Sequence, residues 1–264
     1  MLDIQRISKT FNPGTVNEKK AITDLSLHLN KGEFVTVIGS NGAGKSTLFN
    51  AIAGSFYVDA GAITVGGHNM TFLPEYKRAK RIGRLFQDPL KGTAPNMTIE
   101  ENLALAARRG QPRGLKWGIT ALERADYREL LKTLDLGLED RLTAKVGLLS
   151  GGQRQALTLL MASLKQPKLL LLDEHTAALD PKTADKVLAL SDQIVQENNL
   201  TTLMITHNMK DAIAHGNRLI MMDAGRVVVD ISGEDKKKLT VPDLLALFSR
   251  ASGSDEANDK MLLS

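Results

Sequence analysis

Apolar residues are grouped along this chain of 264 residues in two different patterns. Residues 169–172 are all leucine and are followed by acidic residues, which is typical of a strand buried on both faces of a parallel sheet. Residues 34–38 form a second apolar segment of strand length. In contrast, Leu25, Leu27 and Leu29 alternate with polar side chains and predict a strand with one face towards solvent. The two patterns together predict an α/β fold with a mainly parallel sheet and a small antiparallel β layer.

Helix signals lie between and after these strands. Thr98 followed by Glu101 is a capping box that predicts a helix start, and apolar residues within 121–134 share one face of a second helix. These two helices predict a helical subdomain over about residues 88–149, inserted between strands of the core. Asp180 followed by proline predicts another helix, because these residues are favoured as N-cap and first helical residue. We also expect helices over about 154–164 and 241–249, a strand over 202–205 and a closing hairpin over 218–229.

A glycine-rich segment follows the predicted strand at 34–38 and precedes an apolar segment of helical length. Its sequence GSNGAGKST matches the phosphate-loop pattern, in which Gly42 and Gly44 let the backbone N–H groups turn towards an anion. The N-terminus of the following helix adds positive charge. Lys45 can then reach the β- and γ-phosphates, and the hydroxyl of Ser46 can bind Mg²⁺. A glycine turn with an exposed lysine is the alternative, but the complete motif in strand–turn–helix context favours a nucleoside triphosphate site. We expect the cofactor-binding residues here to be Gly39, Ser40, Asn41, Gly42, Ala43, Gly44, Lys45, Ser46 and Thr47.

Polar residues follow other predicted strands and complete the chemistry that phosphoryl transfer to water requires. Because the carboxyl ends of parallel strands share one edge of a sheet, we expect these residues to lie near the phosphate loop. Asp173 is expected to bind Mg²⁺ with Ser46, and Gln87 to complete the metal shell or order the water. Glu174 is placed to polarise the attacking water, and His207 to stabilise charge on the γ-phosphate. A surface carboxylate and a strand-end cap are the structural alternatives for these last two residues.

Composition narrows the possible classes of protein. The apolar fraction of 42% suffices for a core, and the aromatic fraction of 4% argues against a platform that stacks many bases. The chain has no cysteine, no apolar run near the ~20 residues that span a bilayer and no signal-peptide pattern at its N-terminus. We therefore expect a soluble, cytoplasmic chain. The net charge is +4, and the basic runs at 77–81 and 236–238 predict solvated faces, with contact to nucleic acid or an anionic membrane as the alternative.

Two further features have both a local and a ligand-binding interpretation. Residues 149–153 have the sequence LSGGQ, in which Ser150 is a suitable N-cap and the glycines ease the chain into a helix. Phe11 lies in the predicted antiparallel layer, where it can stack on an adenine base or pack as an ordinary aromatic residue.

Taken together, the motifs resemble those of the ATP-binding-cassette ATPases. The resemblance rests on residues 39–47, Gln87, the LSGGQ segment, residues 169–174, residues 178–180 and the Thr-His pair ending at His207, in this order, and it extends from about residue 2 to 248. It implies a cassette that binds ATP and Mg²⁺ and pairs head to tail with a second, identical cassette. The residues expected to contact the nucleotide held by the partner's phosphate loop are Ser150, Gly151, Gly152, Gln153 and Asp180.

The chain departs from the family pattern at two positions. His175 replaces the proline that usually follows the catalytic glutamate, and Asn208 replaces an aspartate that often follows the histidine. Neither change removes a group that the chemistry needs, so we expect an active ATPase. A catalytic part for His175 is the less favoured interpretation.

The resemblance also implies a role at the cytoplasmic face of a membrane. A single cassette without membrane spans resembles the detached ATPase subunit of a transporter, with separate permease subunits and an extracytoplasmic substrate-binding protein. Importers of amino acids or similar small solutes are the closest match, and exporters of lipid or polysaccharide are an alternative. A soluble cassette acting on nucleic acid or ribosomes is disfavoured, because the chain has one phosphate loop and no sustained heptads. We expect one ATPase domain over residues 1–250 and a flexible tail over 251–264.

Overall fold

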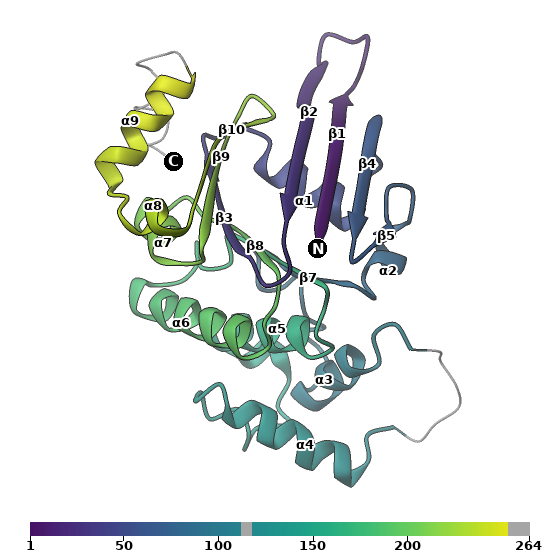
Figure 1. Cartoon of the computed structure of the whole chain (residues 1–264). Helices are drawn as coiled ribbons and strands as arrows, with labels where there is room; N and C mark the ends of the chain where they lie inside the picture. Colours follow the sequence, from purple (N-terminus) through teal and green to yellow (C-terminus); the bar gives the residue numbers. More distant parts are fainter. Residues whose placement is uncertain (112–117, 253–264) are drawn as a thin grey trace.

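The computed structural model describes residues 1–111 and 118–252, and the strands within these ranges form two sheets (Figure 1). The larger sheet has the strand order β10-β9-β3-β8-β7-β6. Its strands are β3 (Phe34–Gly39), β6 (Ile82–Leu85), β7 (Leu169–Asp173), β8 (Thr202–Ile205), β9 (Arg218–Asp223) and β10 (Arg226–Ser232). The pairs from β9 to β6 are parallel, and β10 runs antiparallel to β9. The predicted mainly parallel sheet is confirmed.

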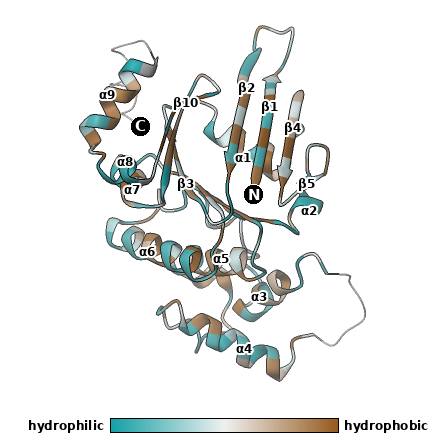
Figure 2. Ribbon diagram, viewed as in Figure 1, coloured by the Kyte–Doolittle hydropathy of each residue, from teal (hydrophilic) through white to brown (hydrophobic). Residues whose placement is uncertain are grey.

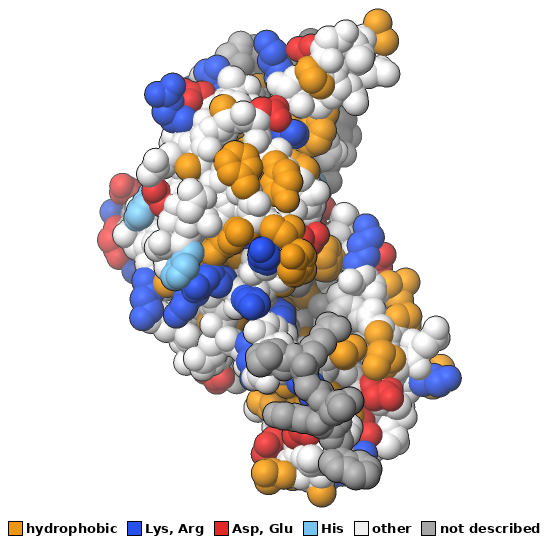
Figure 3. All heavy atoms as spheres, turned by 90° about the vertical axis from the view of Figure 1, so that its right-hand side faces the viewer, with side chains coloured by type: hydrophobic (Ala, Val, Ile, Leu, Met, Phe, Trp, Pro, Cys, Tyr) orange, Lys and Arg blue, Asp and Glu red, His pale blue; other side chains and the backbone are white. Residues whose placement is uncertain are grey.

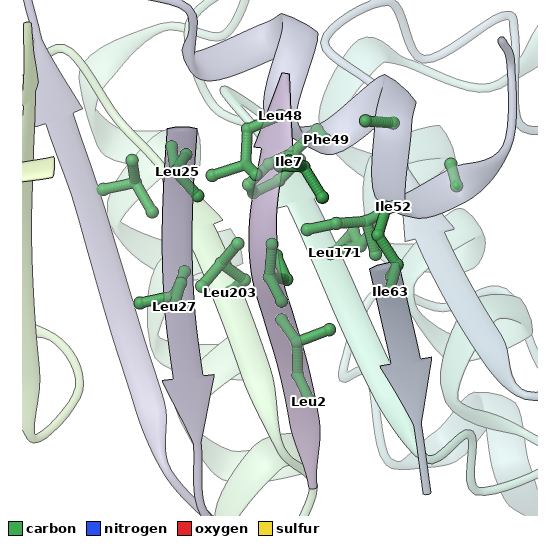
Figure 4. Packing of buried hydrophobic residues seen from close by; sticks show 14 of the residues in the cluster. Leu2, Ile7, Leu25, Leu27, Leu48, Phe49, Ile52, Ile63, Leu171 and Leu203 are labelled. Atoms are coloured by element: carbon green, nitrogen blue, oxygen red, sulfur yellow. The ribbon is translucent and has the colours of Figure 1, made fainter. Parts of the chain in front are cut away.

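The smaller sheet is antiparallel and has the order β2-β1-β4-β5. It contains β1 (Leu2–Phe11), β2 (Lys19–Leu29), β4 (Ala60–Val65) and β5 (His68–Asn69). Helix α1 (Lys45–Ala53) lies between the two sheets, and Leu48, Phe49 and Ile52 of this helix pack in one cluster with Leu171 of β7 and Leu203 of β8 (Figure 4). The predicted antiparallel layer is therefore present and covers the helix that follows the phosphate loop.

Helices cover the opposite face of the large sheet. They are α5 (Gly151–Ser163) and α6 (Pro181–Glu197), and residues of both share a buried cluster with β6, β7 and β8. Helices α3 (Ile99–Ala107) and α4 (Ala121–Lys132) and the short 3₁₀ helix η1 (Val146–Leu148) form a separate cluster with α5. Figure 2 shows hydrophobic and hydrophilic residues alternating along α4 and α6, as expected for helices with one face on a core. The short helices α2 (Glu75–Arg78), α7 (Met209–Ala214) and α8 (Gly233–Lys237) and the last helix α9 (Val241–Ser252) complete the described chain.

The structure differs from the sequence predictions at several element boundaries. Helix α5 begins at Gly151 and not at Arg154, because Ser150 and Gln153 form a capping box that holds both glycines in the first turn. Strand β2 begins at Lys19, which is earlier than its alternating leucines indicate. Helix α7 was not predicted, although Asn208 caps it by accepting two backbone hydrogen bonds. The predicted tail beyond residue 252 lies outside the described residues.

Both basic runs contain a buried member, which contradicts their prediction as wholly solvated faces. Arg78 is 1% exposed and donates hydrogen bonds to the carbonyl oxygens of Ala51 and Ile52 at the end of α1. Lys236 is 2% exposed and donates to the carbonyl oxygens of His215 and Gly216 after α7. Each cation thus satisfies carbonyl groups that a helix end leaves without partners.

Candidate functional site

The phosphate-loop segment leaves β3 and enters α1 at the edge of the sheet where the parallel strands end. Lys45 is buried and folds back, so that its Nζ donates to the carbonyl oxygens of Gly39 at 2.6 Å and Ser40 at 3.1 Å. A Cβ atom on Gly39 would lie 2.2 Å from the carbonyl oxygen of Met222, and one on Gly44 would lie 2.6 Å from that of Ala21. Both glycines also have positive φ, of 152° and 100°. Side chains are thus excluded where β9 and β2 approach the loop.

Strand pairing brings the predicted acidic residues to the same edge. Asp173 is the last residue of β7 and pairs with Ile205, the last residue of β8, which is also a parallel neighbour of β3. Glu174 follows with φ of 44°, a conformation that is strained for a residue with a side chain and is typical of functional sites. The sheet therefore places two adjacent carboxylates beside the loop that carries Lys45.

Electrostatic interactions connect these residues. Burial lowers the pKa of the Lys45 ammonium group, whereas the charges of Glu174 and Asp173 act in the opposite direction. Burial raises the pKa of Asp173, and the guanidinium of Arg84 opposes this rise. The loop lysine and the two carboxylates thus form one interacting group, as expected from the sequence.

His207 lies against Glu174. Its Nε2 is 2.6 Å from Oε1 of Glu174, and the side chains are 26% and 9% exposed. Nδ1 of His207 is buried and has no hydrogen-bond partner among the described residues. A buried histidine nitrogen rarely stays unpaired, so Nδ1 is the unmet hydrogen-bonding group of the His207 ring.

Gln87 follows directly after β6 and Phe86, and its side chain is exposed. The carbonyl oxygen of Phe86 accepts a hydrogen bond from Nε2 of Gln155, which belongs to α5. The backbone before Gln87 is therefore fixed, while the Gln87 side chain is free to meet a ligand at the sheet edge.

Phe11 stands at the end of the β1–β2 hairpin that borders the loop. It pairs with Lys19, whose Nζ lies 4.0 Å from the position that a Cβ atom on Gly42 would take. The Phe11 ring is half-buried and packs edge-on against Phe56, with 5.2 Å between centroids and 83° between planes. The Phe11 ring therefore packs within the protein and remains partly exposed.

Residues 150–153 and Asp180 lie apart from this group. Ser150 is exposed and caps α5 through Gln153, and Asp180 is exposed and caps α6 through the backbone N–H of Thr183. Among the described residues, no hydrogen bond or ion pair joins them to Lys45 or the two carboxylates. A Cβ atom on Gly152 would lie 2.1 Å from Cγ2 of Thr183, so this glycine permits close packing of α5 on α6. Residues 150–153 therefore cap α5 and pack it on α6 within one chain. The start of α5 remains exposed to an external ligand.

His175 points away from the site. It is 2% exposed, and its Nε2 lies 3.0 Å from Oγ of Ser191 on α6. Ser191 already donates its proton to the carbonyl oxygen of Val187, so we assign the proton between them to Nε2 of His175. Burial lowers the pKa of His175 to about 4. The residue is a neutral packing and hydrogen-bonding partner of α6, and its position gives no support to a catalytic part.

Arg84 is a site residue that the sequence analysis missed. It lies on β6 and its Nη2 is 3.4 Å from Oδ2 of Asp173. A charged residue within an otherwise apolar strand that ends just before Gln87 was the available signal.

A hollow of the described surface lies elsewhere. It has a volume of about 620 Å³ and is lined by Gly67, His68, Asn69, Met70, Leu73, Lys77, Lys80 and Arg81. Arg81 precedes β6, so the hollow lies at the opposite edge of the sheet from Asp173. Figure 3 shows Lys and Arg side chains near hydrophobic ones on the face of the molecule that carries β4, β5 and α2. This hollow contains none of the predicted site residues.

The chain is similar in sequence to known ATP-binding proteins of transporters. Residues 22–177 match the sequence model of the ABC transporter family. The chain is 48% identical to a tyrosine transport ATP-binding protein of Clostridioides difficile, an alignment that covers 95% of this chain and 100% of that protein. It is 39% identical to a methionine import ATP-binding protein of Rhizobium etli, over 79% of this chain and 56% of that protein.

Solved structures of the same kind are also similar. A dimeric bacterial ABC transporter cassette has 29% identity and a TM-score of 0.75, with 88% of this chain and 98% of that chain covered. A dimeric cassette in a post-hydrolysis state, bound to ADP and Pi, has 29% identity and a TM-score of 0.74, with the same coverage.

The environment of His175 predicts a pH dependence of stability. Its pKa is about 4 in the folded chain and 6.5 for a histidine that is free in water, so unfolding takes up a proton between these values. The stabilisation from the neutral imidazole is complete above pH 6.5 and is lost as the pH falls, by about 2 kcal/mol at pH 5. Urea unfolding should show that the free energy of unfolding falls less from pH 7 to pH 5 in His175→Gln than in the wild type. His68→Gln, which alters an exposed histidine, is the control, and an equal pH dependence in all three proteins would contradict the assignment.

Proposed function

The chain belongs to the ABC transporter family, and we propose that it binds Mg²⁺·ATP with the residues described above and couples hydrolysis to import of an amino acid such as tyrosine. It is an ATP-hydrolysing cassette of the importer type. The observation that carries the residue assignment is the convergence of Lys45, Asp173 and Glu174 with His207 at one edge of the parallel sheet.

The donor set fits Mg²⁺. Ser46, Asp173 and Gln87 offer hydroxyl, carboxylate and amide oxygens at the sheet edge, and Mg²⁺ prefers oxygen ligands. Within residues 1–111 and 118–252, no three His, Cys, Asp or Glu side chains cluster as a metal cage. Mg²⁺ typically binds through one or two carboxylates together with substrate phosphates, and Asp173 is the one carboxylate in the proposed set. When bound, the ion supplies positive charge that stabilises the β- and γ-phosphate oxygens.

Glu174 and His207 act on water and on the γ-phosphate. Glu174 polarises the attacking water through the carboxylate oxygen that His207 leaves free. The contact of 2.6 Å lets His207 orient this carboxylate, and its imidazole, which is 26% exposed, is the group that a phosphate oxygen or water can approach. Lys45 binds the phosphates from the loop, and Phe11 stacks on the adenine.

A second cassette completes each site. Ser150 and Gly151 are exposed at the N-terminus of α5, where backbone N–H groups favour an anion, and Asp180 is exposed at the start of α6. We propose that two chains pair head to tail, with residues 150–153 and Asp180 of one chain facing the nucleotide on the other. The dimeric state of the similar cassettes supports this arrangement.

The helical subdomain at 88–149 carries the proposed contact with a permease. Leu90, Leu105, Leu122 and Leu148 are exposed there, with 48–74% of each side chain accessible. Exposed apolar side chains of this size are suited to a protein partner. None of the helices in the described ranges is long and apolar enough to cross a bilayer. Because the relatives are transport ATP-binding proteins, the proposed partners are separate permease subunits and an extracytoplasmic binding protein, with no nucleic-acid partner, and the proposed location is peripheral on the cytoplasmic face.

Glu174→Gln should retain ATP binding and hydrolyse ATP at least ~100-fold more slowly, because the amide cannot polarise water as the carboxylate does. Phosphate release and binding of a fluorescent ATP analogue measure the two properties. Glu100→Gln alters another buried carboxylate, which is paired with Arg124 in the helical subdomain, and should retain most of the activity. Near-normal turnover in Glu174→Gln would assign the base to another residue.

Ser150→Arg should leave ATP binding by the single chain unchanged and reduce hydrolysis about 100-fold, because the added side chain blocks approach of the partner's nucleotide. The matched control is Thr120→Arg, which removes an equivalent capping box at the start of α4. Sedimentation of both variants with ATP, in the Glu174→Gln background, measures dimer formation. A Ser150→Arg chain that dimerises like the control would overturn the head-to-tail site.

A further inference from the structure

Arg84 occupies an unusual place for a charged residue. Strand β6 pairs in parallel with β7, in a register that sets Arg84 opposite Leu171. Ile82 and Leu85 of the same strand are buried in the core, and the Arg84 side chain is also only 13% exposed. Because an arginine is rarely buried to this extent without partners, its contacts indicate what the residue does.

The guanidinium connects β7 with the helix that follows the phosphate loop. Nη2 donates to Oδ1 of Asn50 on α1 at 2.7 Å and lies 3.4 Å from Oδ2 of Asp173. Nη1 lies 3.4 Å from Oγ of Ser55, and the guanidinium is 4.6 Å from the centroid of the Phe86 ring. These contacts fix the planar group on several sides.

Asp173 depends on this contact. Among the described residues, Arg84 is the one side chain that donates a hydrogen bond to the Asp173 carboxylate. Asp173 is half-buried beside Glu174, whose like charge raises the pKa of the Asp173 carboxyl group. Without the guanidinium, the carboxylate would be left without a partner that sets its rotamer.

We propose that Arg84 is a positioning residue for metal binding, which holds the Asp173 carboxylate at the end of β7 in the orientation that Mg²⁺ requires. The inference rests on the proposed role of Asp173 as a metal ligand. Partners that orient metal ligands in this way typically contribute 10–100-fold to metal affinity. Gln87, another of the proposed ligands, lies two residues beyond the end of β6 at Leu85.

The test is a titration of Mn²⁺, as a paramagnetic substitute for Mg²⁺, into the chain saturated with a non-hydrolysable ATP analogue. Free Mn²⁺ is measured by electron paramagnetic resonance. We expect Arg84→Met to bind Mn²⁺ about 10-fold more weakly than the wild type. Binding of the nucleotide in the presence of a chelator should be unchanged, because Arg84 acts through the metal ligand.

Two controls separate this effect from a loss of fold or a wrong metal site. Arg218→Met removes a guanidinium that is 16% exposed and paired with Glu33 and Asp230 near the opposite edge of the sheet, and it should keep the wild-type Mn²⁺ affinity. Asp173→Asn should weaken Mn²⁺ binding at least as much as Arg84→Met. If Asp173→Asn loses Mn²⁺ affinity and Arg84→Met retains or increases it, the positioning role is wrong and the metal site stands. If Asp173→Asn also binds Mn²⁺ like the wild type, Asp173 is not a metal ligand, and the proposed positioning role of Arg84 is then wrong as well.

Discussion

Charge balance at the carboxyl edge of the parallel sheet is the constraint on which the rest of this structure depends. Lys45, Asp173 and Glu174 are held within electrostatic reach of one another in surroundings that are partly removed from water. An unbalanced charge in such a place costs on the order of several kcal/mol, so each group requires the others. The parallel pairing of β3 and β7 with β8 is what directs the loop and the acidic pair to the same edge. In the proposed complex, the triphosphate and Mg²⁺ would bring further charges of both signs to this arrangement.

The surrounding elements keep that edge in place. Helix α1 is covered by the antiparallel sheet, and its C-terminal carbonyl groups are satisfied by the buried Arg78. Helix α6 is tied to the strand that carries the acidic pair through the contact between His175 and Ser191. Helix α5 joins the exposed Ser150 to Gln155, which holds the backbone before Gln87. The segment proposed to face a partner cassette and the backbone before Gln87 are therefore connected through one helix.

The sequence predicted those features that depend on local pattern. The leucine run at 169–172, the phosphate-loop motif and the capping residues Thr98 and Asp180 each led to an element that the structure contains. The prediction was wrong where tertiary contacts decide. A run of Lys and Arg is normally solvated, and its spacing does not reveal that Arg78 fills a helix end. Likewise, the contact of Arg84 with Asp173 joins residues far apart in the sequence and requires the register of β6 and β7. The burial of His175 depends on the packing of α6 in the same way.

The most direct test of the central claim is the affinity of Lys45→Ala for ATP, measured with a fluorescent analogue on a variant whose fold is checked by circular dichroism. We predict a loss of at least about 100-fold, because the only cation within the loop is removed from the phosphates. Lys45 also bonds to the carbonyl oxygens of Gly39 and Ser40, and these contacts hold the loop whether or not a nucleotide is bound. A folded Lys45→Ala chain that binds ATP like the wild type would show that Lys45 has only this structural role. That result would contradict the assignment of the nucleotide site.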